Sequence, residues 1–376
     1  MSINVRRFFF AKTNTVQRRI NKTRFNLTKY KGALPFFIVI FAIQNGAFAQ
    51  DDTLHVQVAR MAKLDTIKAI PATQDSVIAG KMVDPDFNSH QLYLDPAVKK
   101  KRVIFNTALH AAIYTGSMII LNQAWYADYP KTSFHTFNDN GEWLQVDKAG
   151  HMWSAYQISR TSMASWKWAG LNEKQQIWFG GLAGAVFQTV IEVQDGFSAE
   201  WGWSWGDFTA NCLGSALLIS QQLAWHEQRI NYKFSFHRMS YDDPMLNARS
   251  DSLFGTSIPE RTLKDYNGQT YWLSANIKSF FPKSKFPAWL NISVGYGADG
   301  MFGGFDNTWE ENGTTVDRTD IPRVRQFYLA PDIDFTKIPT KSKFLKGVFF
   351  VLNAFKMPAP ALMFSKEKVK VYAVYF

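Results

Sequence analysis

The hydrophobic pattern of this chain changes its period near residue 228. Before that point, long apolar stretches carry Gly, Ala and Ser at helical spacing, whereas after it apolar and polar residues alternate, as in 230–237. A helix returns to the same face about every 3.6 residues and a strand every two, so the two halves cannot share one architecture. We therefore expect an α+β fold, with an apolar four-helix bundle in residues 103–228 followed by an antiparallel β-rich region in residues 229–376.

The predicted bundle consists of four apolar stretches, at residues 103–126, 149–168, 175–195 and 207–226. The first has no formal charge, and its length alone would allow it to cross a membrane. However, it is preceded by the basic cluster Lys99-Lys100-Lys101-Arg102, which in an exported chain would lie on the outer side, against the positive-inside tendency. We therefore expect a bundle at or near a membrane surface, with spanning of the inner membrane as the alternative.

The second half contains about six candidate strands, at residues 230–237, 270–281, 289–303, 323–335, 346–356 and 368–376. The last one ends on Phe376 in an aromatic, alternating pattern that resembles the end of outer-membrane barrel proteins. Closed membrane barrels have at least about eight strands. We therefore expect either a sheet that covers the helices or a partial, membrane-associated barrel.

Residues 1–49 have the pattern of a signal peptide. They contain nine basic residues and no acidic one, then the apolar stretch 33–43, and they end in Ala47-Phe48-Ala49, which fits a cleavage site before Gln50. An uncleaved anchor is the alternative. Residues 50–102 are polar and mixed, and we interpret them as a linker. The protein is therefore expected in the bacterial cell envelope, in the periplasm or the outer membrane.

The net charge of +11 does not indicate a nucleic-acid partner. Without the leader, the chain has 33 basic against 31 acidic residues, so it lacks the excess of positive charge that follows a phosphate backbone. The one cysteine, Cys212, cannot form an internal disulfide, and it lies too far from the leader to carry a lipid anchor. The partners that we expect instead are membrane lipid or another envelope component.

Polar residues gather at the ends of three predicted helices. They are Asp147, Lys148, His151 and Arg160 on the second helix, Glu192 and Asp195 at the end of the third, and Asp207 and Asn211 at the start of the fourth. Residues four apart share one face of a helix. If neighbouring helices run antiparallel, these ends meet, and we expect His151 to lie close to both Glu192 and Asp207.

Three motifs in this order resemble the VanZ-like family: Asp147-Lys148-x-x-His151, an apolar helix that ends in Glu192, and Asp207-x-x-x-Asn211-x-x-Gly214. The Glu-x-x-Asp spacing of Glu192 and Asp195 is more similar to relatives of that family, the predicted periplasmic lipoproteins of the YfiM type. The resemblance covers about residues 103–226, and it implies a helical bundle in the envelope without a settled activity. The chain departs from those lipoproteins in lacking a lipidation cysteine and in adding the β-rich half.

One imidazole with two or three carboxylates is a suitable ligand set for a divalent metal, and His151, Glu192, Asp195 and Asp207 supply it here. The same groups suit acid–base work, with His151, Glu192 and Asp207 as candidate catalytic residues. Lys148 or Arg160 can bind a phosphate headgroup. The candidate binding residues are Asp147, Lys148, Arg160, Asp195 and Asn211.

Three functions fit this cluster. The first hypothesis is a non-enzymatic envelope protein that binds lipid or another envelope component. The alternative is a metal-assisted or acid–base hydrolase or transferase that acts on a lipid or phosphate headgroup. A buried polar network that only fixes the packing would also explain these residues, for example with Asp207 capping the fourth helix and Arg160 pairing with Glu192. The sequence leaves open whether the protein is an enzyme.

Overall fold

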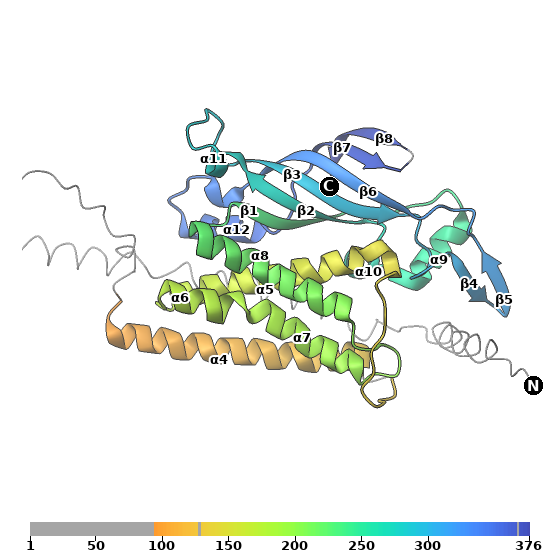
Figure 1. Cartoon of the computed structure of the whole chain (residues 1–376), viewed down its shortest axis with the longest axis horizontal. Helices are drawn as coiled ribbons and strands as arrows, with labels where there is room; N and C mark the ends of the chain where they lie inside the picture. Colours follow the sequence, from red (N-terminus) through yellow and green to blue (C-terminus); the bar gives the residue numbers. More distant parts are fainter. Residues whose placement is uncertain (1–93, 127–128, 367) are drawn as a thin grey trace, which may run out of the picture.

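The computed structural model describes residues 94–126, 129–366 and 368–376. A layer of helices lies against an antiparallel sheet (Figure 1), and the predicted α+β class is confirmed. The predicted signal peptide, and all but the end of the predicted linker, lie outside the described residues.

The helical layer contains four long helices and several short ones. The long helices are α4 (Pro96–Leu121), α5 (Val146–Trp168), α7 (Ala183–Gly196) and α8 (Trp205–Trp225). The short ones are η3 (Asn122–Tyr126), η4 (Glu142–Gln145), α6 (Glu173–Gln175) and η5 (Gln176–Gly180). The four long helices fall on the four apolar stretches of the sequence, as expected from their period.

Helix α4 begins inside the segment that we predicted as a linker, because Asp95 and Pro96 start it. The Asp95 carboxylate accepts hydrogen bonds from the amides of Ala97 and Val98, and proline is favourable in the first turn. Among the described residues, α4 is the one helix long and apolar enough to cross a membrane, and only 11 % of its apolar stretch is buried. Its buried residues are polar and are Arg102, Asn106 and Ser117.

Small residues allow α5 to approach both α7 and α8. A Cβ atom on Gly184 would lie 1.9 Å from the carbonyl oxygen of Ala155, and one on Gly214 would lie 2.2 Å from that of Met152. Ser159 of α5 also shares a hydrogen bond with Ser215 of α8 at 2.9 Å. The close contact explains why buried polar groups on these helices reach one another.

The sheet has six antiparallel strands in the order β1-β2-β3-β6-β7-β8. They are β1 (Ile230–Phe236), β2 (Gln269–Asn276), β3 (Leu290–Asp299), β6 (Val324–Ile333), β7 (Ala359–Ser365) and β8 (Val369–Tyr375). A separate hairpin pairs β4 (Thr308–Glu311) with β5 (Thr314–Asp317). The sheet is not closed into a barrel, since β1 and β8 are its two ends.

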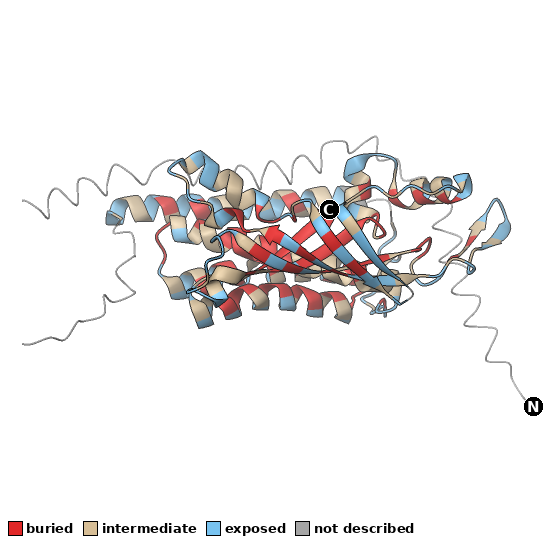
Figure 2. Cartoon of the chain, turned by 90° about the horizontal axis from the view of Figure 1, so that it is seen from above, coloured by how far each residue is buried: buried red, intermediate tan, exposed pale blue. Residues whose placement is uncertain are grey.

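The open sheet is nevertheless strongly curled. The hydroxyl of Tyr375 on β8 donates to that of Tyr328 on β6 at 2.8 Å and lies 2.9 Å from the hydroxyl of Thr270 on β2. In a flat sheet with strands about 4.8 Å apart, β2 and β8 would be separated by about 19 Å. The sheet therefore has an inner face and an outer face, and burial alternates along its strands (Figure 2).

Helix α5 packs on the outer face at one end of the sheet, over β1 and β2. Tyr156 of α5 contacts Tyr232 of β1 edge to face, and the amide of the Gln157 side chain donates to the carbonyl of Tyr232 at 2.7 Å. Leu218 of α8 and Tyr271 of β2 belong to the same buried cluster. This contact joins the helical half to the β-rich half.

One predicted strand is wrong. Residues 346–356 were expected to be extended, but α12 (Lys343–Leu352) occupies most of them, with Ser342 as its cap. A short continuous apolar run does not distinguish a strand from a buried helix, and here the cap decides. The sequence pattern also did not reveal β7, which contains Pro360, or the helical segments α9 (Pro244–Phe254), α10 (Ile258–Lys264), α11 (Ile277–Phe280) and η6 (Phe335–Lys337).

Candidate functional site

The candidate site lies where the start of α5, the end of α7 and the start of α8 meet. Ser204 caps α8, because its hydroxyl accepts a hydrogen bond from the amide of Asp207 at 3.0 Å. The same hydroxyl donates to Asp139 in the preceding loop at 2.6 Å. The antiparallel course of the helices thus brings side chains far apart in the sequence to one end of the layer.

Lys148 lies at the centre of three carboxylates. Its ammonium group is 2.6 Å from Asp139, 2.9 Å from Asp147 and 2.9 Å from Asp207. Burial alone would lower the pKa of Lys148, but the charges of Asp147 and Asp207 and the hydrogen bond to Asp139 raise it above its ordinary value. Lys148 is therefore a fixed cation that holds the two helices and the loop together.

A second group of ligand atoms surrounds His151. One nitrogen or oxygen from each of His151, Glu192 and Asp207 lies within 4.8 Å of the others. His151 Nδ1 is 3.5 Å from Glu192 Oε1, and His151 Nε2 is 3.7 Å from Asp207 Oδ1. The His151 side chain is 28 % exposed and that of Glu192 only 2 %, so solvent reaches the group from the histidine side.

Crowding of carboxylates in a buried place disfavours their charged forms. Burial, and then the charges of Asp207 and Asp195, raise the pKa of Glu192 to about 9. Burial is also the main reason why the pKa of Asp195 and that of Asp207 are each raised to about 6. Burial likewise raises the pKa of Glu142, a neighbour of Lys148, to about 7. The cluster therefore holds more carboxyl groups than Lys148 can neutralise, and Glu192 keeps its proton at neutral pH.

Two carboxylate oxygens in this group lack the hydrogen bonds that buried oxygens normally have. Glu192 Oε1 is buried and has no hydrogen-bond partner among the described residues, and Asp207 Oδ1 has an ion pair with Lys148 but no hydrogen bond. His151 Nδ1 lies 3.2 Å from Asn211 Oδ1. If Nδ1 donates to that oxygen, the lone pair of Nε2 faces the Asp207 carboxylate. A cation between them would remove this repulsion.

The second acidic group, Asp139, Asp147 and Asp207, also has the spacing of a metal site. However, the ammonium of Lys148 already lies within 3 Å of all three carboxylates. We therefore place the candidate metal site at His151, Glu192 and Asp207, and not around Lys148.

Asp195 lies beside the group but is not one of its three close members. It accepts a hydrogen bond from the hydroxyl of Tyr126 at 2.7 Å. Tyr126 in turn lines a pocket with a volume of about 330 Å³ between the end of α4 and the end of α7. Lys131, Val193 and Phe197 also line this pocket, so it offers an apolar wall and one amine next to the polar cluster.

Arg160 is not brought to the cluster. It lies about 13 Å further along α5 than His151, from the rise of a helix. Its guanidinium donates to the Gln157 side chain at 3.1 Å and to the carbonyl of Phe350 at 3.0 Å, and it lies over the Phe350 ring. It therefore connects α5 to α12, and the pairing with Glu192 that the sequence suggested is absent.

Three residues of the site were not singled out from the sequence: Tyr126, Asp139 and Ser204. Asp139 lies in a loop rich in Asp, Asn and Gly, and Ser204 directly precedes the predicted fourth helix at the position of a cap. Tyr126 ends an apolar stretch and gave no signal. Loop residues reach a site only through the tertiary course of the chain.

Residues 135–221 match a protein family described as predicted periplasmic lipoprotein (DUF2279). This match covers the candidate site, from Asp139 to Asn211, but less than a quarter of the chain. It agrees with the predicted localisation in the cell envelope, and it supports a periplasmic protein of unknown function without the narrower resemblance to VanZ-like or YfiM-type proteins. No curated protein and no solved structure matches the chain.

Proposed function

We propose that this envelope protein binds a divalent cation through His151, Glu192 and Asp207, and that the cation helps it to bind an anionic lipid headgroup or another anionic envelope component. One observation carries the proposal. Three ligand atoms lie within 4.8 Å of one another, and the most buried of them, Glu192 Oε1, has no hydrogen-bond partner among the described residues. A bound cation would compensate for the desolvation of that oxygen.

The donor set narrows the choice of metal. One imidazole nitrogen and two carboxylate oxygens suit a first-row divalent ion such as zinc or manganese better than calcium, which prefers oxygen ligands alone. Three protein ligands leave a coordination position for an oxygen from outside, and a headgroup phosphate can supply it. Asn211 is placed to orient His151 through the contact with Nδ1.

The neighbouring pocket supports a lipid or a similar amphiphile as the bound component. Its wall includes Val193, Phe197 and the ring of Tyr129, with Tyr126 on the side of the cluster and Lys131 as a cationic group. In this proposal an acyl chain lies against the apolar part of the wall, and its phosphate binds both the amine and the metal. The narrower relation to YfiM-type and VanZ-like proteins is part of this proposal, since it rests on the motif residues that form the cluster.

A second candidate is a metal-assisted or acid–base hydrolase or transferase that acts on the same headgroup. The observation in its favour is that the pKa of Glu192 is raised to about 9, mainly by burial. A carboxyl group that keeps its proton at neutral pH can act as a general acid. Binding and turnover use the same residues, so activity toward lipid phosphates distinguishes the two.

The first test is the metal content of the full chain in detergent. Equilibration with zinc or manganese should load one ion per chain, and His151→Ala should abolish loading. His226→Ala is the matched control, because His226 caps the other end of α8 beside Glu173. Absence of ion from the unmodified chain, or equal loading of His151→Ala, would contradict the cation site. Release of phosphate or headgroup from lipid by the loaded chain would favour the enzyme.

A further inference from the structure

The outer face of the sheet presents apolar side chains to the surroundings in continuous rows. One row runs across five neighbouring strands through directly paired residues, which are Leu273, Val294, Leu329, Leu362 and Val371. All five are exposed, from 37 % for Leu329 to 76 % for Val371. A second row, of Phe327, Phe364 and Val369, lies beside it and is also exposed. None of these positions carries a polar group.

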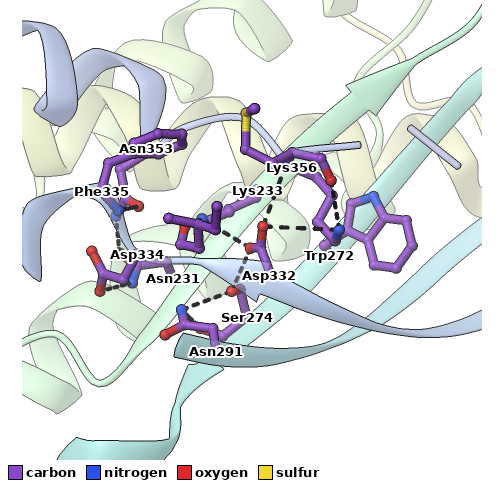
Figure 3. Close-up of polar contacts among 12 residues, drawn as sticks. Asn231, Lys233, Trp272, Ser274, Asn291, Asp332, Asp334, Phe335, Asn353 and Lys356 are labelled. Carbon is purple, nitrogen blue, oxygen red and sulfur yellow. Dashed lines mark hydrogen bonds and ion pairs between the residues drawn. The ribbon is translucent and has the colours of Figure 1, made fainter. Parts of the chain in front are cut away.

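The inner face holds buried charges beside a buried apolar cluster around Trp272, Tyr328 and Met363. Lys233 and Asp332 form an ion pair at 2.9 Å, and neither side chain is exposed to solvent. Figure 3 shows this pair with Ser274, Asn291 and Lys356 in a continuous polar network. The inner face is therefore filled by its own side chains, whereas the outer face leaves aliphatic and aromatic groups exposed. A sheet in water normally keeps its exposed face polar.

One margin of the sheet is basic and aromatic. The connection from β2 to β3, residues 277–289, and the segment with α12, residues 335–353, together contain seven lysines and no acidic residue. β2 and β6 run in the same direction, so the two segments that follow them lie at the same end of the sheet. Figure 1 shows α11 and α12 at this end. Phe281, Phe286 and Phe344 on this margin are more than half exposed.

We infer that the outer face of the sheet is a lipid-binding surface, with acyl chains of a bilayer leaflet against the apolar rows and anionic headgroups at the basic margin. This inference goes beyond the cation site and does not depend on it. A protein partner typically forms about one hydrogen bond per 100–200 Å² of interface, and the two rows offer no side chain for one. Lysines and aromatic rings at the edge of an apolar surface are typical of a membrane interface.

The apolar rows are tested with single fluorescent labels. In a Cys212→Ser background, Val294→Cys places a label on the first row, and Thr314→Cys places a control label on the exposed β4–β5 hairpin. The full chain is reconstituted into phosphatidylcholine vesicles that contain phosphatidylglycerol, with or without doxyl-labelled lipid. Doxyl lipid should quench the label at position 294 several-fold and leave the label at position 314 unchanged.

Two results would overturn the inference. Equal, weak quenching at both positions means that the rows face water. A label at position 294 that is shielded from water, unaffected by doxyl lipid and cross-linked to a second chain means that another copy covers the face.

The basic margin is tested by charge reversal. Lys283→Glu with Lys285→Glu should weaken binding to the anionic vesicles by at least about thirtyfold, from the attraction expected for two lysines near an anionic surface. The matched control is Lys366→Glu with Lys368→Glu between β7 and β8, at the opposite end of the strands. It should change binding much less, and an equal loss in both variants would refute the assigned margin.

Discussion

The clearest test of the polar network on the inner face of the sheet is the removal of the Asp332 carboxylate. This group is the only acidic partner of two buried lysines in the described network (Figure 3): Lys233 lies 2.9 Å from one oxygen and Lys356 lies 3.9 Å from the other. Ser274 also donates to it at 2.7 Å. Asp332→Ala removes the ion pair of both ammonium groups and leaves them with hydrogen bonds to the backbone carbonyls of Ile333 and Met357.

The expected loss of stability depends on how many buried charges each variant leaves without a partner. Removing one partner of a buried ion pair typically costs about 3–5 kcal/mol, because the other charge remains buried without compensation. Lys233→Met should cost less, on the order of 2 kcal/mol, because Asp332 keeps Lys356 and Ser274 as partners. The double variant Lys233→Met with Asp332→Ala should then lose less than the sum of the two single losses.

The assay is urea unfolding of the full chain in detergent, followed by tryptophan fluorescence and extrapolated to zero urea. Trp272 lies beside the network, with Lys356 over its ring at 5.1 Å. Asp320→Ala is the control, since this carboxylate is mostly exposed beside Arg318 and should leave the free energy of unfolding nearly unchanged. Equal losses for Asp332→Ala and Lys233→Met, or fully additive losses, would refute the argument that Asp332 compensates two buried charges.

Three further predictions concern the helical half. Gly184→Ala should destabilise the protein by about 1–3 kcal/mol, because the new Cβ would overlap the Ala155 carbonyl, whereas Gly116→Ala on α4 meets no atom within 4 Å and should not; thermal unfolding of both checks this. In metal-free protein, the folded state holds the Glu192 proton up to a pKa of about 9 against an ordinary 4.5. The free energy of unfolding should therefore fall as the pH rises through that interval, and Glu192→Gln should flatten the fall in urea titrations at several pH values. Ser204→Ala should cost about 1 kcal/mol through loss of the α8 cap, and an unchanged unfolding midpoint would contradict that role.

The local sequence pattern alone predicted the fold class and much of the polar cluster around His151. The change of period near residue 228 predicted helices before strands, because burying one face of each element requires those spacings. The helix-end positions of His151, Glu192 and Asp207 predicted their convergence, which the distances of 3.5 and 3.7 Å show. Their chemical roles and the binding of a metal remain predictions that the experiments above address.

Other features were not accessible from the sequence. Residues 343–352 form a helix although their apolar run fits a strand, and Arg160 donates to the Phe350 carbonyl of α12 although the sequence also allowed it to pair with Glu192. Both depend on contacts between segments distant in the chain. The same holds for Asp139, which reaches Lys148 from a loop.

The hydrophobic period and the composition of the sequence are local properties. By themselves they determined that this protein has a helical half, a β-rich half and polar residues at helix ends. Only the tertiary structure decided which face of the sheet is the outer one. Alternation separates Val294 from Ser293 and Leu329 from Tyr328, but either set could have faced inward. The curl of the sheet, with Tyr375 reaching Thr270, enclosed the face that carries Lys233, Asp332 and Trp272, and it left the aliphatic rows outside.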